Sequence, residues 1–304
     1  MRSEKPSATA CLIAASLGFC SHDPALAGLV NPLAAELSVP FMDTYGPPAS
    51  LFSGCVNKSW ARKLAYGIEQ STLPGILLHY IVRKRYLEES AIQLLNQNIR
   101  QVVVLGGGFD VLALDLHRRF PQIFFFEIDY PATQATKRTA LGDKTRVKDN
   151  LIFLPVDLKQ KTLAEALVRH PRYQSSQDTL FVAEGVLMYL TQKEVEALFG
   201  FIRTHSGSGS RFAFTFMEPR SDGYVNFHNR SRIVDAWMKL RGEPFAWGIS
   251  RDQLPSFLAK VGFSQENLAT PDVFRRQYLS SRELIKKPLA EGEYVCVARK
   301  NDRF

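Results

Sequence analysis

Three consecutive glycines and the acidic residue that follows them are the positions of this sequence best suited to holding a ligand. Gly106, Gly107 and Gly108 come directly after the apolar run "VVVL". Glycines let backbone N–H groups approach a ligand closely, because no side chain stands in the way. Asp129 ends the next apolar run, "FFFEID", about twenty residues beyond the glycines, where a carboxylate can accept hydrogen bonds from both hydroxyls of a ribose. These positions predict a site for a nucleoside-type cofactor.

Two later apolar runs also end in acidic residues. Asp157 and Leu158 follow "LIFLPV", and Glu184 follows "TLFVA". The carboxyl ends of parallel strands meet at one edge of a sheet, so we expect Asp129, Asp157 and Glu184 to lie beside the glycine loop. Glu127 alternates with Asp129 along its run and is expected to point the other way, in a structural role.

The elements that must position these residues are strands and helices in alternation. Six apolar runs are separated by helical patterns: "QVVVLGG", "QIFFFEID", "NLIFLPVDL", "TLFVAEGVLMYL", "RFAFTFME" and "EYVCVARK". Several runs are continuous rather than alternating, which is typical of strands buried on both faces of a parallel sheet. Thr191 and Glu194 form a capping box, which predicts the start of a helix. Repeated strand–helix units predict an α/β fold with a doubly wound, mostly parallel sheet.

We expect a single domain over residues 1–304. Residues 1–99 are predicted to form a helical N-terminal cap, with breaks at "HDP", "YGPP" and "LPG". Residues 100–304 are predicted to form the cofactor-binding sheet.

A long segment between the fifth run and the end of the chain has the character of a substrate lid. Residues at about 218–250 are polar and rich in aromatic side chains, which suits a lid better than a plain sheet connection. Arg220, Arg230 and Arg232 are candidates for holding an anionic acceptor there, although a solvated surface is the expected role of any one of them. His228 stands alone and is not expected to be catalytic.

Composition sets limits on the partners and the compartment. The 304 residues are 45% hydrophobic and 22% charged, which are ordinary values for a globular protein. The net charge is +8, but the basic residues are scattered without a long run, so a nucleic-acid partner is not expected. Four cysteines without C-x-x-C spacing indicate reduced thiols in a cytoplasmic protein and suggest no zinc site.

The N-terminal stretch has some features of an export signal. It carries Arg2 and Lys5, an apolar segment, and "ALA" before Gly28. Ser16 and Gly18 dilute the apolar segment, and the cysteines do not indicate an oxidising compartment, so we do not expect export. No other segment approaches the length of a membrane span, and we expect no membrane partner.

The spacing of the glycines discriminates between cofactors. A dinucleotide fingerprint needs G-x-G-x-x-G, but Val111 stands where the third glycine would be. A phosphate loop of the G-K-[ST] type is absent from the sequence. S-adenosyl-L-methionine has no phosphate, so a glycine turn with a ribose carboxylate suits it better than it suits NAD.

Several segments resemble the leucine carboxyl methyltransferase family of class I S-adenosyl-L-methionine-dependent methyltransferases. They are "LHYIVRKRYLEESAIQLL", "VVLGGGFDVLALDL", "FEIDYPATQATKR", "PVDL" and "FVAEGVLMYLTQKEVEALF". The likeness spans about residues 8–300 and implies a Rossmann-like sheet of seven strands. The stretch "AASLGFCSHDPALAGLV" also resembles the opening of that family, which implies that the N-terminal segment belongs to the folded enzyme.

The resemblance implies roles for individual residues toward the cofactor. Arg83 would pair with the methionine carboxylate, Gly106 and Gly108 would form the turn beneath it, Asp129 would bind the ribose, Asp157 and Leu158 would frame the adenine, and Glu184 would approach the methionine amino group. No catalytic residue is assigned, and Tyr189 and Arg220 are candidates for positioning the acceptor. The phosphatase-directed members carry a lysine where "TACLIAAS" aligns, and this chain has none there, which puts a phosphatase substrate in doubt.

The acceptor is expected to be a carboxylate oxygen, of a protein C-terminus or of a small acid. Direct in-line transfer to a carboxylate needs no general base, and the strand-end motifs contain no evident His/Asp pair. The alternatives are a small-molecule hydroxyl, as in the polyketide-type O-methyltransferases of the same family, and a tRNA-nucleoside carboxylate. Two further alternatives are a non-catalytic cofactor-binding protein and an NAD-dependent oxidoreductase. We expect a monomer or a homodimer.

Overall fold

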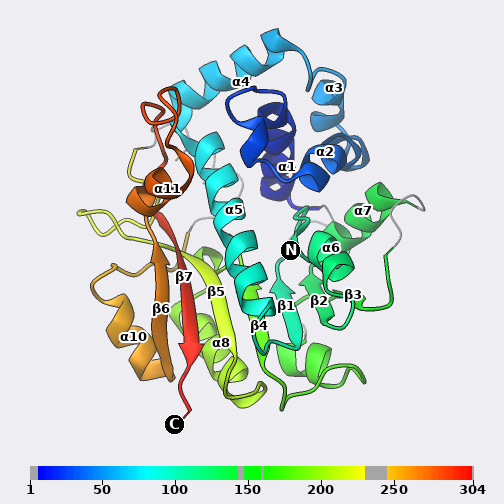
Figure 1. Ribbon diagram of the computed structural model, residues 1–304, viewed down its shortest axis with the longest axis vertical. Helices are drawn as coiled ribbons and strands as arrows, with labels where there is room; N and C mark the ends of the chain where they lie inside the picture. Colours follow the sequence, from blue (N-terminus) through cyan, green and yellow to red (C-terminus); the bar gives the residue numbers. More distant parts are fainter. Residues whose placement is uncertain (1–5, 143–146, 159–160, 230–244, 303–304) are drawn as a thin grey trace.

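A computed structural model describes residues 6–142, 147–158, 161–229 and 245–302. Its centre is a seven-stranded sheet in the order β3-β2-β1-β4-β5-β7-β6 (Figure 1). The strands are β1 Gln101–Leu105, β2 Phe124–Asp129, β3 Leu151–Pro155, β4 Thr179–Ala183, β5 Arg211–Met217, β6 Phe263–Ala269 and β7 Glu293–Lys300. Strand β7 pairs antiparallel with β5 and β6, and the other neighbours pair parallel. The predicted doubly wound, mostly parallel sheet is confirmed.

Helices cover both faces of this sheet. They are α1 Ala8–Ser21, α2 Pro32–Tyr45, α3 Ala49–Ser53, α4 Ser59–Thr72, α5 Ile76–Leu95, α6 Leu112–Arg119, α7 Pro131–Leu141, α8 Gln192–Thr204, α10 Leu254–Val261 and α11 Pro271–Tyr278, with short helical turns η1 Ala27–Leu29, η2 Ala164–Val168 and η3 Leu187–Tyr189. Successive residues of a strand point to opposite faces, so Val102 packs with α1, α2, α5 and α6, whereas Val103 packs with α8 and α10. The predicted capping box is present, because Thr191 and Glu194 bond reciprocally at the start of α8.

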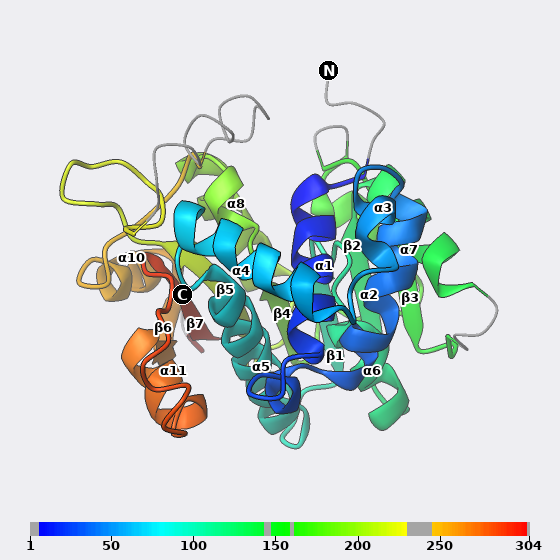
Figure 2. The same cartoon turned by 90° about the horizontal axis from the view of Figure 1, so that it is seen from above.

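The N-terminal apolar stretch forms α1, which is part of the main core. The Ser7 hydroxyl caps the helix by accepting from the Ala10 amide, and the Ser7 amide donates to Thr133 Oγ1 of α7 at 3.1 Å. Cys11 and Leu17 are buried among the other apolar side chains. Figure 2 looks down on the end of the molecule where α1, α2 and α4 lie in front of the strands. No helix among the described residues is long and apolar enough to cross a membrane.

Strand β4 ends at Ala183, so Glu184 follows it as expected, and η3 is a separate turn. One detail of the fold differs from the sequence-based reading. Strand β6 was not among the six predicted runs. Its residues 264–267 are exposed, because β6 is an edge strand and carries a polar sequence.

The predicted lid overlaps a part of the chain that is not described. Residues 230–244, with Arg230 and Arg232, lie outside the described residues. The flanking positions are anchored to the sheet, since the Ala246 amide donates to the Met188 carbonyl at 2.7 Å and the Ile249 amide to the Met217 carbonyl at 2.9 Å.

Candidate active site

The glycine loop lies at the switch point of the sheet, where β1 separates β2 from β4. Gly106 and Gly108 have φ angles of 65° and 48°, which side-chain-bearing residues rarely adopt. Each glycine is also packed closely: a Cβ would lie 2.6 Å from Val186 Cγ2 at Gly106, 2.6 Å from Glu127 Cγ at Gly107 and 3.0 Å from Ala10 Cβ at Gly108. The three glycines are therefore required by the packing of the loop itself, in addition to any approach of a ligand.

Asp129 joins the end of β2 to this loop. One carboxylate oxygen accepts from the Gly108 amide, and the other accepts from the Tyr130 amide at 2.6 Å. Burial raises the pKa of Asp129, and the two amide donors only partly oppose that effect. The predicted pair of a glycine turn and a β2 carboxylate is thus in direct contact.

Arg83 and Glu184 are also brought together, although they are 101 residues apart in the chain. Arg83 of α5 is only 3% exposed and donates to Glu184 Oε1 from Nε at 2.9 Å. Its Nη1 donates at 2.6 Å to Glu293 Oε2, at the start of β7. The pKa of Arg83 is raised, because the two carboxylates outweigh the opposing effect of burial. The Glu293 carboxylate also contacts His79 Nε2 at 2.9 Å.

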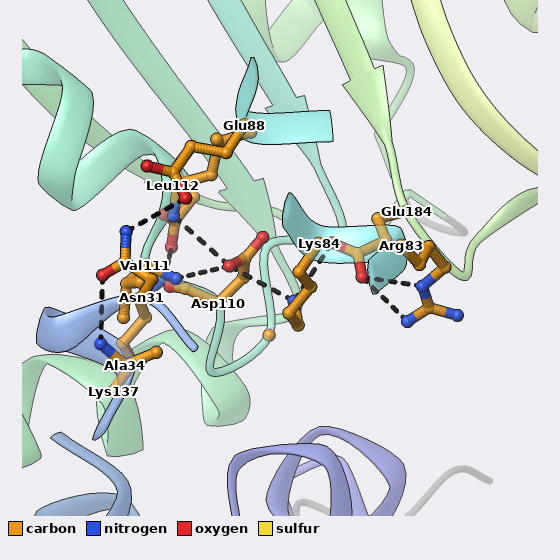
Figure 3. A network of polar contacts seen from close by, with 12 residues as sticks. Asn31, Ala34, Arg83, Lys84, Glu88, Asp110, Val111, Leu112, Lys137 and Glu184 are labelled. Atoms are coloured by element: carbon orange, nitrogen blue, oxygen red, sulfur yellow. Dashed lines mark hydrogen bonds and ion pairs between the residues drawn. The ribbon is translucent and has the colours of Figure 1, made fainter. Parts of the chain in front are cut away.

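A second cation continues this network toward the glycine loop. Lys84 Nζ lies 3.0 Å from Glu184 Oε2 and 3.3 Å from Asp110 Oδ1, which places it between the two acids (Figure 3). Lys137 of α7 donates to the Asp110 carbonyl and lies 2.6 Å from Glu127 Oε1. Basic side chains and carboxylates therefore alternate from His79 to Asp110, and Lys137 links the Asp110 carbonyl to Glu127 at the base of the site.

Burial affects these acids differently according to their partners. It opposes ionisation of Asp110, but Lys84 and Lys137 outweigh it and hold the Asp110 pKa below its usual value. Burial dominates at Glu127 and raises its pKa to about 7 in spite of Lys137. Burial also acts to raise the pKa of Glu293, but Arg83 and His79 outweigh it and lower that pKa to about 2.

A small pocket borders the middle of the network. It lies between η1, α2, α5 and α6, and its lining includes Asn31, Lys84, Glu88, Asp110 and Glu184. Because three members of the charge network, Lys84, Asp110 and Glu184, line it, a ligand group in this pocket would meet charged atoms of both signs.

The remaining predicted site residues lie around these elements. Asp157 and Leu158 follow the end of β3, and the intervening Val156 amide donates to the Asp129 carbonyl at 2.8 Å. Leu158 is 53% exposed, so its side chain is open to a ligand. Tyr189 packs edge-on against Phe245, with ring centroids 5.4 Å apart.

Arg220 is not part of the charge network. Its Nε lies 3.6 Å from Asp222 Oδ2 in an exposed turn. His228 contacts the Glu218 carbonyl through Nε2 at 3.1 Å.

Sequence reasoning missed five members of the network: His79, Lys84, Asp110, Lys137 and Glu293. Lys84 and Asp110 could have been identified from the sequence, because Lys84 directly follows Arg83 and Asp110 directly follows "GGGF". The other three lie in ordinary helix or strand patterns, where a charged residue reads as a solvated position.

Comparison with known proteins decides the family. The sequence model of the leucine carboxyl methyltransferase family matches residues 22–203, more than half of the chain. The chain belongs to the leucine carboxyl methyltransferase family. The predicted membership of this family of S-adenosyl-L-methionine-dependent methyltransferases is therefore confirmed.

Similar curated proteins agree with this family. A protein of Mycobacterium tuberculosis is 24% identical over 282 residues, covering 90% of this chain and 86% of its own. One of Mycobacterium sp. strain JLS is 25% identical over 307 residues, with 97% and 94% covered. Both are named "Putative S-adenosyl-L-methionine-dependent methyltransferase".

A solved structure shares the fold. The crystal structure of a "putative methyltransferase" from Thermobifida fusca has a TM-score of 0.59 at 16% identity, over 86% of this chain and 94% of the other. The predicted Rossmann-like fold of the class I methyltransferases is confirmed.

Replacing Lys137 by methionine should reveal the strength of the buried pair beneath the loop. The substitution leaves Glu127 buried without its cation, so we expect a loss of about 3–5 kcal/mol in the free energy of unfolding. The loss should grow as pH rises, because the pKa of Glu127 is raised and its neutral form is tolerated only at lower pH. Urea unfolding at several pH values measures it.

The double variant Lys137→Met/Glu127→Gln should regain most of that stability, because no buried charge is left unpaired. Replacing the exposed Lys193 by methionine is the matched control and should cost less than about 0.5 kcal/mol. A Lys137→Met protein as stable as the parent would contradict the assignment.

Glu293 should control part of the stability at acid pH. Its pKa is lowered from 4.5 to about 2, so its stabilising contribution is present above pH 4.5 and is lost as pH falls toward 2. That contribution is about 3 kcal/mol, and Glu293→Gln should flatten the dependence of the unfolding free energy on pH in this window. Urea unfolding at a series of pH values tests this, with the exposed Glu283→Gln as control. An unchanged slope in the Glu293 variant would refute the prediction.

Proposed function

We propose that this protein transfers the methyl group of S-adenosyl-L-methionine to a carboxylate oxygen of its acceptor. The observation that carries the proposal is the meeting of Arg83, Glu184 and Asp129 at one edge of the sheet in a member of this family. When bound, the cofactor supplies the methyl group on its sulfonium.

The residues at this edge fit both ends of the cofactor. The guanidinium of Arg83 has five N–H donors, of which the contacts with Glu184 and Glu293 engage three, so it retains donors for the methionine carboxylate. Each oxygen of Glu184 accepts up to two hydrogen bonds, which leaves capacity for the methionine ammonium group. Asp129 would accept from the ribose hydroxyls, while Gly106 and Gly108 would form the turn beneath the cofactor.

The β3 end would complete the cofactor site. Leu158 would offer its exposed side chain to the adenine, together with Asp157. Tyr189 would lie on the acceptor side, because it packs with Phe245 at the edge of the segment predicted as a lid. Arg220 is a weaker candidate for positioning the acceptor, since it is half-exposed and pairs with Asp222.

A carboxylate acceptor suits the proton chemistry of the site. A carboxylate is already ionised at neutral pH, so the enzyme needs only to position it in line with the sulfonium and exclude water. Among the described residues, His79 is the one histidine of the charge network, and its side chain is completely buried against Glu293.

A hydroxyl acceptor is the second candidate, and one observation favours it. His79 Nε2 is held by Glu293, whereas His79 Nδ1 is buried with no hydrogen-bond partner in the described structure. A histidine oriented by a carboxylate is the usual arrangement of a general base, which a hydroxyl acceptor would require.

Cofactor binding is tested first by calorimetry. We expect the protein to bind S-adenosyl-L-methionine and to ignore NAD, and we expect Asp129→Ala to weaken binding by about a hundredfold because two ribose hydrogen bonds to a buried carboxylate are lost. The control is Asp222→Ala, which removes an exposed carboxylate remote from the network. Equal affinity of the Asp129 variant and the parent would refute the assigned role.

The kind of acceptor is tested by the stability of the methylated product. With a methyl-labelled cofactor and a panel of peptides, small acids and small phenols or alcohols, we expect label that mild alkali releases as methanol, because methyl esters hydrolyse whereas methyl ethers do not. Alkali-stable label would select the hydroxyl alternative. In that case His79→Gln should lower kcat and remove a limb of its pH profile.

A further inference from the structure

An uncovered apolar surface lies on α3 and α4, away from the charge network. We call it the α3–α4 face and define it by Leu51, Phe52, Trp60, Leu64 and Ile68, which are 71%, 46%, 56%, 52% and 57% exposed. These are five of the ten large hydrophobic side chains that are exposed among the described residues. Apolar exposure is therefore concentrated within residues 51–68, and such a concentration is typical of an interaction site.

The orientation of α4 is unusual for a helix of a globular protein. Trp60, Leu64 and Ile68 are spaced four residues apart, so they share one face of the helix. An amphipathic helix normally turns this face to the core. Here the buried residues of α4 are Ala61 and Glu69 only, and the apolar stripe points outward.

The exposed charges of α3, α4 and the residues that join them have one sign. Between Asp43 and Glu69 the sequence contains Lys58, Arg62 and Lys63 but no acidic residue. Glu69 itself is buried and accepts from the Leu77 amide at 3.0 Å.

A neighbouring loop meets the other side of α4. Lys287 Nζ lies 5.5 Å from the centre of the Tyr66 ring, and Tyr66 is two positions from both Leu64 and Ile68, on the opposite face of the helix. That loop carries the exposed Ile285 and Lys286 and also the exposed acid Glu283. The cations that belong to the apolar row itself, which includes a tryptophan, are therefore Lys58, Arg62 and Lys63.

We propose that the α3–α4 face docks on an anionic lipid surface. Apolar side chains at such a surface enter the boundary between headgroups and acyl chains, and tryptophan is enriched there. Lysines and arginines beside them pair with lipid phosphates. Charge complementarity selects an anionic surface, because the helix offers cations and no exposed carboxylate. This proposal differs from the expectation of no membrane partner, which was based on the lack of a segment long enough to span a membrane.

Docking would also orient the catalytic edge. The arrow of β7 points away from α4 in Figure 1, and β5 runs antiparallel to β7, so the carboxyl ends of the parallel strands lie at the α4 end of the molecule. A lipid surface bound by α3 and α4 would therefore lie on the side of the molecule toward which that edge points, with helices α1, α2 and α4 between the two.

Vesicle co-sedimentation of the full chain tests the docking. We expect binding to phosphatidylcholine vesicles that contain about 30% phosphatidylglycerol, weak binding to pure phosphatidylcholine, and loss of binding in about 0.5 M salt. The variant Trp60→Ser/Leu64→Ser/Ile68→Ser should reduce the partition coefficient at least about tenfold. So should Lys58→Glu/Lys63→Glu, which leaves the apolar row intact. Val147→Ser, at an exposed apolar position elsewhere, should bind as the parent does.

Several outcomes would overturn the proposal. The parent chain could stay in solution with every vesicle, or both altered proteins could partition as the parent does. Sedimentation velocity without lipid gives a third outcome: a dimer of the parent that the triple serine variant abolishes would show that a second copy covers the face. Thermal unfolding checks that both variants fold, and if the serine variant fails, the charge-reversal variant decides alone.

Discussion

The burial of Arg83 between two glutamates is the constraint on which the rest of the site depends. Its contacts join three elements distant in the chain: α5, the end of β4 at Glu184 and the start of β7 at Glu293. Removing the partner of a buried charge costs several kcal/mol, so each of these groups requires the others. The helical N-terminal region therefore cannot move away from the sheet at this point without leaving charges unpaired in an apolar interior.

The same need for paired buried charges links Arg83 to the glycine loop. Lys84 takes the second oxygen of Glu184 and reaches Asp110, whose carbonyl accepts from Lys137. Lys137 in turn neutralises Glu127, and the Glu127 carboxylate fills the space that a side chain at Gly107 would need. Position 107 must therefore be glycine because the Glu127 side chain, which pairs with Lys137, occupies the space beside it. Gly106 and Gly108 are required by their positive φ angles as well. A loop supported in this way is held rigid before any cofactor arrives, which is the condition for precise positioning.

The sequence predicted the parts of the molecule that depend on local pattern. Continuous apolar runs marked five of the six parallel strands, and four of these five, β1, β2, β4 and β5, are largely buried on both faces. Strand β6 gave no such signal, since an edge strand can be polar. Arg83 and Glu184 were identified only through the family resemblance. Their partner Glu293 is 210 residues from Arg83, and no local pattern records a contact of that separation.

The hydrophobic pattern of α4 shows another limit of sequence reasoning. Its four-residue spacing of apolar side chains is the pattern of a helix packed on a core, and nothing in the spacing tells which neighbour covers it. Only the folded arrangement shows that no described element does, and that α4 instead forms an outer rim of the molecule. The role of such a row of apolar side chains can be assigned only when its place in the folded molecule is known in addition to its place in the sequence.

Charge is distributed differently in the two parts of the molecule to which we assign functions, the cofactor site and the lipid-docking face. The buried network contains Arg83, Lys84 and Lys137 against four carboxylates, so it carries no excess of positive charge. The net charge of +8 must therefore reside on the surface, and the stretch from Lys58 to Lys63 without acidic residues is one place where it accumulates. Surface cations act through a screened, long-range field, whereas the buried pairs act at contact distance and are little affected by salt. Salt should consequently change how the protein associates with anionic surfaces and leave the geometry of the cofactor site intact.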